Sequence, residues 1–288
     1  MPATEIGAII LRSEEKTLEQ AKKSVLENGF YIPIYNLKGE LIFSQEEYDQ
    51  AVKDLNLTVP VEVWDFSLKT GEQKGSNPGG EFTTPTEKGP TKYYVKYTGP
   101  ANRDQIWNEY LADQIYRELG ILVPDTKIVR VEGTYGHASE MLEIDEQTDR
   151  SDLKNGFIAD CLLANWDVSY NFENAKSVGG RIYRLDNGGA LLFRARGQRK
   201  GEDLFGPKVN ELKKGTDRER LGFGMRQEYA SLTKAEIEKQ ARALKRKLTN
   251  SKIDELVDSV RLPQKDRDYL KQVLKARCDF IIEQYLGK

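Results

Sequence analysis

Three polar residues in one stretch of the sequence have the types and spacing of a site for metal and phosphate. Asp167 follows an apolar run, Asn174 stands seven residues later, and Asp186 precedes an Asn-Gly-Gly turn. A carboxylate placed in this way can orient a hydroxyl group and accept its proton. Carboxylate and amide oxygens are also ligands that Mg²⁺ prefers. The stretch therefore predicts a site for a metal-bound nucleotide, with turn formation as the alternative for each residue alone.

Two upstream segments carry residues suited to phosphate. The string GSNPGG at 75–80 bends freely, and successive backbone N–H groups in such a loop can hold phosphate; a plain turn is the alternative. Lys96 lies in a β-rich string, where a half-buried ammonium group needs an anionic partner; an edge position in solvent is the alternative. Glu109 stands thirteen residues later on an amphipathic helix, where a surface position is the alternative. A strand Lys and a Glu of the next helix position nucleotide phosphates in protein kinases.

Composition narrows the chemistry that the chain can perform. It has 288 residues, a formal net charge of −2, one histidine and two cysteines, so no global field draws it to nucleic acid or membrane. His137, in a turn-like string, is the one histidine for a Ser-His-Asp or Cys-His mechanism. A multi-His or Cys-rich zinc site is excluded. What remains for chemistry is carboxylates, amides, lysines and glycines.

The two cysteines and the N-terminus indicate a compartment. Cys161 and Cys278 stand far apart in apolar helices, which favours core positions in a reducing environment over a disulfide framework. The first residues do not have the pattern of a signal peptide, and no run approaches the length of a membrane span. We therefore expect a cytoplasmic protein, with delivery into a host cell left open.

Sequence periodicity predicts the elements that must position these residues. The mostly β first part and mostly helical second part predict an α+β fold. Ser44 and Glu47 form a capping box that opens a helix. The expected strands are 5–11, 59–66, 91–97, 126–133 and 138–144. One hairpin is expected at 31–44, with its turn at Lys38-Gly39, and another around the Asn-Gly-Gly turn (RIYRLD with ALLFRA). The expected helices are 17–29, 103–120, 155–166 and three from Lys234 onward.

The order of these residues resembles a known family. The chain is similar to the HipA/CtkA-like kinases of the protein-kinase-like superfamily, which are related in fold to the phosphatidylinositide 3/4-kinases. The resemblance runs from about residue 75 to the C-terminus and is absent from roughly the first 60 residues. It is carried by the strings GSNPGG, YYVKY, NEYLADQIYRELGILVPDTKIV, ANWDVSYNFEN and RLDNGGALLFRARG.

The resemblance implies a fold and a division of the chain. The fold would be the two-lobed protein-kinase-like α+β fold, with a β-rich N-lobe at 61–145 and a helical C-lobe at 146–288. The C-lobe would carry the catalytic and metal loops. Outside the resemblance, the strand and helix pattern of residues 1–60 predicts a small α/β appendage, which we expect to be available for binding a partner.

The resemblance also implies roles for individual residues, with ATP and Mg²⁺ as cofactors. Asp167 and Lys96 would be catalytic, and Asn174 and Asp186 would hold the metal. The ATP-binding residues would be Gly75, Ser76, Asn77, Pro78, Gly79 and Gly80 of the phosphate loop, Lys96 with its partner Glu109, and Met141, Glu143 and Ile144 of the segment that joins the lobes, whose backbone meets adenine.

Two departures from the kinase pattern concern the loop after Asp167. Kinase loops place the metal-binding Asn five residues after the catalytic Asp, and here that position is Phe172. Asn171 and Asn174 stand four and seven residues after Asp167. We prefer Asn174, because DVSYNFEN resembles a loop lengthened by two residues, and keep Asn171 as the alternative. Ser169 replaces the His that often stands two residues after the Asp, which affects how the loop is braced.

The segment that corresponds to the activation loop is basic. Residues 194–220 contain nine Lys or Arg against five acids. Such a cluster can hold a phosphorylated residue or an anionic substrate, and a solvated loop is the alternative. The residues predicted to contact substrate or phosphate are Arg194, Arg196, Arg199 and Lys200.

The resemblance implies an ATP-dependent kinase that transfers phosphate to Ser or Thr of a protein and to itself. Nothing in the sequence indicates nucleic acid or membrane as a partner. Two alternatives keep the fold and change the product, namely AMP transfer from reversed ATP and phosphate transfer to a lipid. A third is a nucleotide-binding pseudokinase with residues 1–60 as an interaction module.

Overall fold

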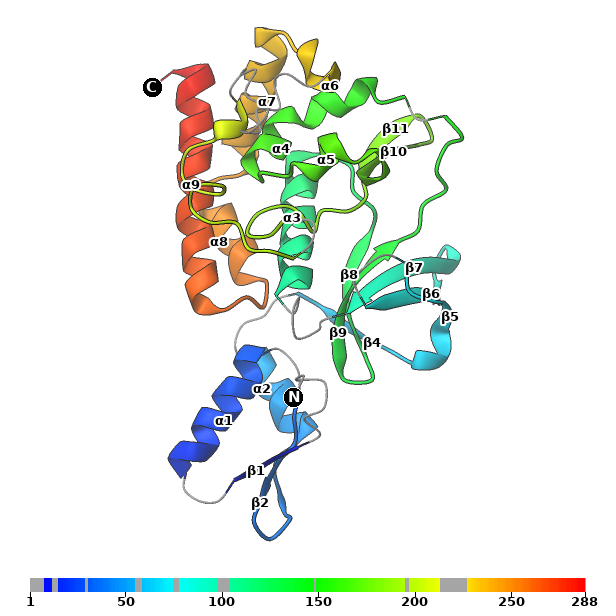
Figure 1. Ribbon diagram of the computed structural model, residues 1–288, viewed down its shortest axis with the longest axis vertical. Coiled ribbons are helices and arrows are strands. Elements are labelled where there is room, and N and C mark those ends of the chain that lie inside the picture. The colour runs from blue at the N-terminus through cyan, green and yellow to red at the C-terminus, as the bar shows by residue number, and fades with distance from the viewer. Residues whose placement is uncertain are drawn as a thin grey trace. The chain divides into compact units, whose positions relative to one another are not determined.

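The computed structural model of this chain describes residues 8–11, 15–28, 31–54, 59–74, 78–97, 104–147, 149–194, 197–212 and 227–287. Helices and strands both contribute to it (Figure 1), so the predicted α+β class is confirmed. Contacts divide the chain into two compact units. One comprises Met1–Trp107, Lys127–Ser139 and Asp258–Pro263, and the other comprises Asn108–Thr126, Glu140–Val257 and Gln264–Lys288. The domain boundaries predicted at residues 60 and 145 stay predictions.

A small α/β layer begins the first unit. Strand β2 lies between β1, to which it is parallel, and β3, to which it is antiparallel. The predicted turn at Lys38-Gly39 is present, with Gly39 at a φ of 79°. Both bonds of the predicted capping box form, from the Glu47 backbone N–H to Ser44 Oγ (3.2 Å) and from the Ser44 N–H to the Glu47 carboxylate (2.7 Å). The elements are β1 (Ile9–Leu11), α1 (Glu15–Asn28), β2 (Ile34–Asn36), β3 (Leu41–Phe43) and α2 (Gln45–Asp54).

A larger sheet carries the rest of the first unit, with the strand order β4-β8-β9-β7-β6-β5. Strand alternation in β7 places Tyr93 and Val95 in a core with Trp64 and Phe82. Lys96 lies on the opposite face and is half-buried. The strands are β4 (Val61–Trp64), β5 (Lys69–Gly71), β6 (Gly79–Thr86), β7 (Gly89–Tyr97), β8 (Thr126–Val131) and β9 (Thr134–Glu140), with a 3-10 turn at Phe66–Leu68.

Two sequence predictions about β9 are wrong. The strand was expected over 138–144, but it starts at Thr134, because a turn with positive φ at Glu132 and Gly133 ends β8 earlier. His137 therefore lies inside a strand, only 1% exposed, and not in a turn.

Helices and one hairpin build the second unit. The helices predicted after Lys234 are confirmed, and the Thr233 hydroxyl and the Glu236 carboxylate form a capping box at the first of them. Cys161 and Cys278 are free and buried, as predicted. The elements are α3 (Gln105–Leu119), a 3-10 turn (Ser151–Gly156), α4 (Phe157–Leu162), α5 (Asp167–Tyr170), 3-10 turns at Phe172–Asn174 and Asn210–Leu212, β10 (Ala175–Val178), β11 (Arg181–Arg184), α6 (Gln227–Ala230), α7 (Lys234–Lys247), α8 (Asn250–Asp258) and α9 (Gln264–Leu286).

The structure corrects the predicted elements on either side of Asp167. The helix expected over 155–166 ends at Leu162, because Ala164 adopts a φ of 48° and the Asn165 N–H bonds to the Asp160 carbonyl, which closes the helix end. The hairpin expected around Asn-Gly-Gly is instead β10 with β11. Its turn is Gly179-Gly180, where both residues have positive φ, the requirement of a tight hairpin turn.

In the ranges that the structure describes, no helix has the length and hydrophobicity needed to cross a membrane.

Candidate active site

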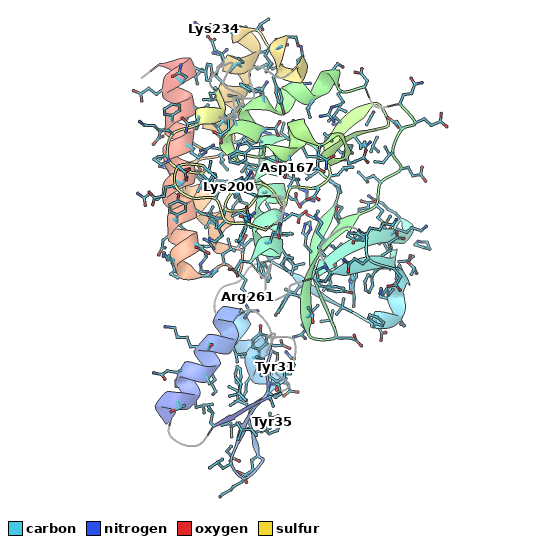
Figure 2. The ribbon with its side chains drawn as sticks, in the orientation of Figure 1. Tyr31, Tyr35, Asp167, Lys200, Lys234 and Arg261 are labelled. Atoms are coloured by element: carbon cyan, nitrogen blue, oxygen red, sulfur yellow. The ribbon has the colours of Figure 1, made fainter. Side chains whose placement is uncertain are left out.

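Asp167 begins the short helix α5, where the charge of Asp186 acts on its carboxyl group. The carboxyl group of Asp167 is half-buried. Burial raises its pKa, and the negative charge of Asp186 raises it further, while the charges of Lys200 and Arg194 oppose the rise. Two carboxylates and two basic side chains of the second unit therefore interact electrostatically (Figure 2 labels Asp167 and Lys200). Repulsion between two like charges is relieved by a cation that lies near both.

The hairpin β10–β11 explains how Asn174 and Asp186 come together. Ala175 pairs with Arg184 at the open end of the hairpin. One residue further out, the Leu185 N–H donates to the Asn174 carbonyl over 2.9 Å. Asn174 and Asp186 thus flank the same end, on opposite strands. Asp186 is exposed, and its Oδ1 accepts from the Gly188 N–H at 3.2 Å.

The other candidate amide, that of Asn171, is already engaged in hydrogen bonds within its own loop. Its Oδ1 accepts from the Glu173 N–H at 3.0 Å and caps the following 3-10 turn. Its Nδ2 donates to the Asn174 Oδ1 at 3.1 Å. Asn171 therefore orients the oxygen of Asn174, and its own oxygen is already used by backbone. This geometry favours Asn174 as the metal ligand, although the assignment stays a prediction.

The donor set fits Mg²⁺. Asp186 offers an exposed carboxylate, and Asn174, at the same end of the hairpin, offers a side-chain amide oxygen; both are hard oxygen ligands. The electrostatic repulsion between Asp167 and Asp186 is a second observation that points to a cation. Among the described residues, no three His, Cys, Asp or Glu side chains gather into a metal cluster.

Buried asparagine side chains hold the loops that carry Asp167 and Asp186, and the sequence analysis did not identify them. Asn165 Nδ2 donates to Asn187 Oδ1 (2.9 Å) and to the Tyr116 hydroxyl (3.0 Å). Asn187 Nδ2 donates in turn to Asp113 at 2.7 Å. Both asparagines are 1% exposed or less. The available signal was an amide inside each of two apolar strings, LLANW and RLDNGGALLF.

A second amide bridge ties the loop after Asp186 to α3. Asn108 Nδ2 donates to the Ala190 carbonyl at 2.9 Å, and its Oδ1 accepts from the Leu192 N–H at 3.1 Å. Leu191 has a positive φ of 53°, and its N–H bonds to the Leu163 carbonyl at 2.7 Å. Residues 190–192 are therefore held in a loop by these bonds, which explains why they do not form a strand.

The four basic residues predicted to meet substrate differ in placement. Arg194 is exposed and acts on the charge of Asp167, which suits the prediction. Arg199 pairs with both carboxylate oxygens of Asp266, at 2.9 and 2.6 Å. Lys200 is only 7% exposed and bonds to backbone carbonyls, which argues against contact with a substrate. Arg196 lies outside the described residues.

The segment predicted to meet adenine is exposed and anchored at one end. Met141 and Ile144 are 36% and 42% exposed, which is unusual for large apolar side chains, and Glu143 is exposed as well. The next residue, Asp145, accepts from the N–H groups of Gly179 and Gly180, both at 2.9 Å. These bonds and one from the Ser177 hydroxyl lower the pKa of Asp145. The segment is thereby tied to the turn of the hairpin that carries Asn174 and Asp186.

The predicted phosphate loop is described only in part. Gly75, Ser76 and Asn77 lie outside the described residues, whereas Pro78 is exposed just before β6. Gly79 opens β6 and pairs directly with Lys96 of β7, and Gly80 pairs with Val95. A Cβ on Gly79 would clash with the Val95 carbonyl oxygen of the paired strand, whereas one on Gly80 would lie 2.7 Å from the Lys69 side chain, which can move. Close strand approach therefore requires glycine at position 79.

Glu109, the predicted partner of Lys96, is 2% exposed, so a surface position is excluded. Lys96 belongs to the first compact unit and Glu109 to the second. Their pairing stays a prediction.

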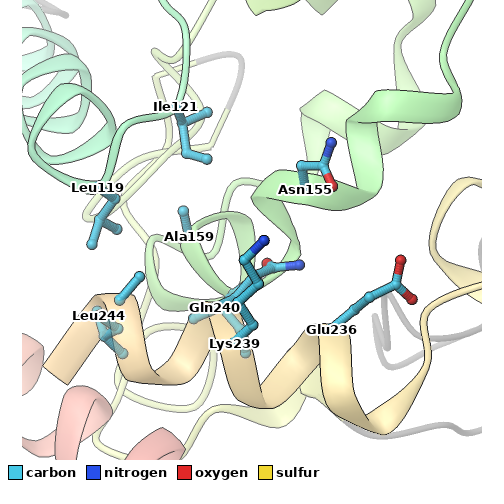
Figure 3. Close-up of a pocket in the computed structure, with 10 residues that line it drawn as sticks. Leu119, Ile121, Asn155, Ala159, Glu236, Lys239, Gln240 and Leu244 are labelled. Atoms are coloured by element: carbon cyan, nitrogen blue, oxygen red, sulfur yellow. The ribbon is translucent and has the colours of Figure 1, made fainter.

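A pocket of about 390 Å³ opens elsewhere in the second unit (Figure 3). Its floor is apolar, and Glu236, Lys239, Gln240 and Asn155 form its polar side. The amide of Gln240 is already used, since it accepts from the Ile158 N–H and donates to the Lys154 carbonyl. None of the predicted site residues lines this pocket.

Comparisons with known proteins bear on the fold. The sequence matches no protein-family model and, at a significant level, no curated protein. The crystal structure of the proinflammatory kinase CtkA from Helicobacter pylori superposes with a TM-score of 0.55 at 14% identity, over 79% of this chain and 99% of that chain.

A second solved structure is HipA of Shewanella oneidensis MR-1, from its toxin–antitoxin complex with HipB and operator DNA. It is 14% identical, with a TM-score of 0.35 over 96% of this chain and 80% of that chain. A TM-score this low supports no argument, and at 14% identity the CtkA match establishes the fold alone. This chain therefore has the kinase fold of CtkA, as the resemblance to the HipA/CtkA-like kinases predicts.

Proposed function

We propose that this chain is an ATP- and Mg²⁺-dependent protein kinase that phosphorylates Ser or Thr residues and can phosphorylate itself. The observation that carries the proposal is the convergence of Asp167 and Asp186 in a kinase fold, with Asn174 flanking the same hairpin end. Preference for Ser and Thr of a protein rests on the sequence resemblance. Residues 1–60, which lie outside the resemblance and carry none of the proposed catalytic residues, are proposed to bind a partner.

Each residue has a physical task in this proposal. Asp167 orients the acceptor hydroxyl and accepts its proton, and its raised pKa makes it a stronger base than an exposed Asp. Asp186 and Asn174 would hold Mg²⁺, which supplies positive charge against the phosphates. Lys96 and the glycines at 79 and 80 would contact the phosphates of ATP. Arg194, exposed beside Asp167, would meet the acceptor or its phosphate. Positioning and electrostatics account for most of the rate in such a reaction.

The test is self-labelling with ATP that carries the radioactive label on either the γ- or the α-phosphate. We expect γ-label to enter the protein in the presence of Mg²⁺ and EDTA to abolish it. Asp167→Asn and Asp186→Asn should each lower incorporation by about 100-fold or more. Asp254→Asn is the matched control, because Asp254 pairs with Lys275 between α8 and α9, away from the site.

The other outcomes identify the alternatives. Incorporation of α-label indicates AMP transfer, and label found only on added phosphoinositide vesicles indicates a lipid acceptor. Binding of a non-hydrolysable ATP analogue without any transfer indicates a pseudokinase. Equal incorporation in wild type and both site variants refutes the residue assignment.

A further inference from the structure

Lys200 is a buried cation to which the proposed reaction gives no task. Its ammonium group donates to the Ala164 carbonyl and to the Gly189 carbonyl, both at 2.7 Å. It also lies 4.7 Å from the centroid of the Trp166 ring. Ala164 stands three residues before Asp167, and Gly189 stands three residues after Asp186. One side chain thus joins the two loops that carry the carboxylates.

The backbone that Lys200 binds is unusual. Ala164 has a φ of 48°, a left-handed conformation that a residue with a Cβ adopts at a cost and that needs support from its surroundings. A buried carbonyl also needs a donor, because leaving it unpaired is costly. Lys200 supplies that donor to Ala164 and, at the same time, to Gly189. The loop conformations before Asp167 and after Asp186 are therefore stabilised by the same group.

The bridge does not depend on the charge of Lys200. Burial lowers the pKa of Lys200 to about 7, while Glu211 and Asp167 act to raise it and Arg277 and Arg194 to lower it. Glu211 in turn accepts from the Trp166 indole N–H (3.2 Å) and from Arg277 (2.9 Å). An amine without its extra proton keeps two N–H donors, which is the number of carbonyls it binds. The bridge therefore exists in both protonation states.

We propose that Lys200 is a positioning residue: by binding the carbonyls of Ala164 and Gly189 together, it fixes Asp167 relative to Asp186. The catalytic consequence rests on the proposed function, whereas the structural consequence rests on the geometry alone. Removing the bridge should leave nucleotide binding mostly intact, because Lys200 touches no predicted ligand of the nucleotide, and should slow the transfer step.

The test uses Lys200→Met, which keeps the aliphatic volume and removes the donors. At saturating ATP we expect self-labelling to fall by about 30-fold or more, while the Kd for a non-hydrolysable ATP analogue with Mg²⁺ changes by less than about 3-fold. In hydrogen–deuterium exchange, peptides that cover 162–168 and 186–194 should exchange faster than in wild type. Lys200→Leu, which also removes both donors, is the second variant if the first does not fold.

Lys275→Met is the matched control, because it breaks an ion pair with Asp254 at the α8–α9 packing and should leave labelling and both loop peptides unchanged. Unchanged exchange at the two loops in a folded Lys200 variant overturns the proposal, and so does unchanged labelling when wild type is active. If wild type transfers no label but the Lys200 variant still exchanges faster at the two loops, the proposed function is refuted and the bridge is supported.

Discussion

At the scale of single residues, the proposed metal site depends on which asparagine, Asn174 or Asn171, supplies an amide oxygen together with Asp186. Asn174 is joined to the strand before Asp186 by backbone, through the bond from the Leu185 N–H. Asn171 acts through Asn174, because its own side-chain oxygen caps a turn and its side-chain nitrogen donates to the Asn174 oxygen. The two asparagines therefore differ in what their removal should do.

We expect Asn174→Ala to remove a metal ligand. Asn171→Ala should leave that ligand in place but less firmly oriented. Self-labelling should fall by about 100-fold or more in the first variant and by about 10-fold in the second, consistent with typical losses for ligands and for the groups that orient them. The Mg²⁺ concentration for half-maximal labelling should rise in both. A larger loss in Asn171→Ala than in Asn174→Ala would reverse the assignment. Asn155→Ala is the control, because Asn155 bonds to Asp152 on the 3-10 turn before α4.

Residue types indicated the carboxylates of the candidate site, but not the groups that hold them. Asp167 and Asp186 stand out in sequence because a carboxylate in an apolar context is costly without a function. Lys200 did not stand out, because a count of basic residues over 194–220 cannot separate a solvated cation from one that is 7% exposed. Burial is set by chain segments far away in sequence, such as those of Ala164 and Glu211, and no local pattern encodes it.

At the scale of elements, the start of β6 is the place where backbone geometry and the proposed ATP site meet. Gly79 pairs with Lys96, and the Val95 carbonyl occupies the space that a Cβ would need. A side chain there must push β7 away from β6, and Lys96 moves with β7.

Gly79→Ala should therefore weaken both folding and nucleotide binding. We expect the free energy of unfolding in urea to fall by about 1–3 kcal/mol, the usual cost of overpacking. The Kd for the ATP analogue should rise by about 10-fold. Pro85→Ala, at the exposed far end of the same strand, serves as the control and should leave the Kd unchanged. A stable Gly79→Ala protein with unchanged affinity would exclude this end of β6 from the nucleotide site.

The elements that local signals specify were predicted, and those that depend on pairing were not. The capping box at Ser44, the turn at Gly39 and the helices after Lys234 form as expected, since a cap or a glycine turn acts within a few residues. The residues of the Asn-Gly-Gly string suit a hairpin turn equally well. They do not form one, and the side chain of Asn187 is instead hydrogen-bonded to Asn165 and Asp113 in the interior. The pairing strand of β11 is instead β10, which Gly179 and Gly180 turn toward it.

At the scale of the whole molecule, the first unit joins segments that are distant in sequence. The N-terminal layer of α1, α2 and their sheet is bound to the larger sheet by Arg130 of β8, which contacts both carboxylate oxygens of Asp49 at 2.5 and 3.2 Å. The segment Asp258–Pro263 also belongs to this unit. The N-terminal layer thus contacts the larger sheet, a result that its sequence did not indicate, because the contacting residues lie far beyond it.

Arg261 is the clearest test of this assembly. It is 7% exposed, its guanidinium lies 5.1 Å from the Tyr48 ring centroid and 5.3 Å from that of Tyr135, and it donates to the Leu26 carbonyl at 3.0 Å. Arg261→Ala removes two cation–π contacts and a buried donor, so the free energy of unfolding should fall by about 2–4 kcal/mol. Hydrogen–deuterium exchange should rise in α1 and α2.

The matched control is Arg242→Ala on the exposed face of α7, which loses only a surface pair with Glu238 at 3.5 Å and should cost less than about 1 kcal/mol. Equal effects of the two substitutions on the free energy of unfolding would mean that Arg261 does not anchor the N-terminal layer. If Arg261→Ala speeds exchange in α1 and α2 as predicted and self-labelling persists, the N-terminal layer depends on Arg261 for its packing but is not needed for phosphate transfer. That result is expected for a segment that binds a partner.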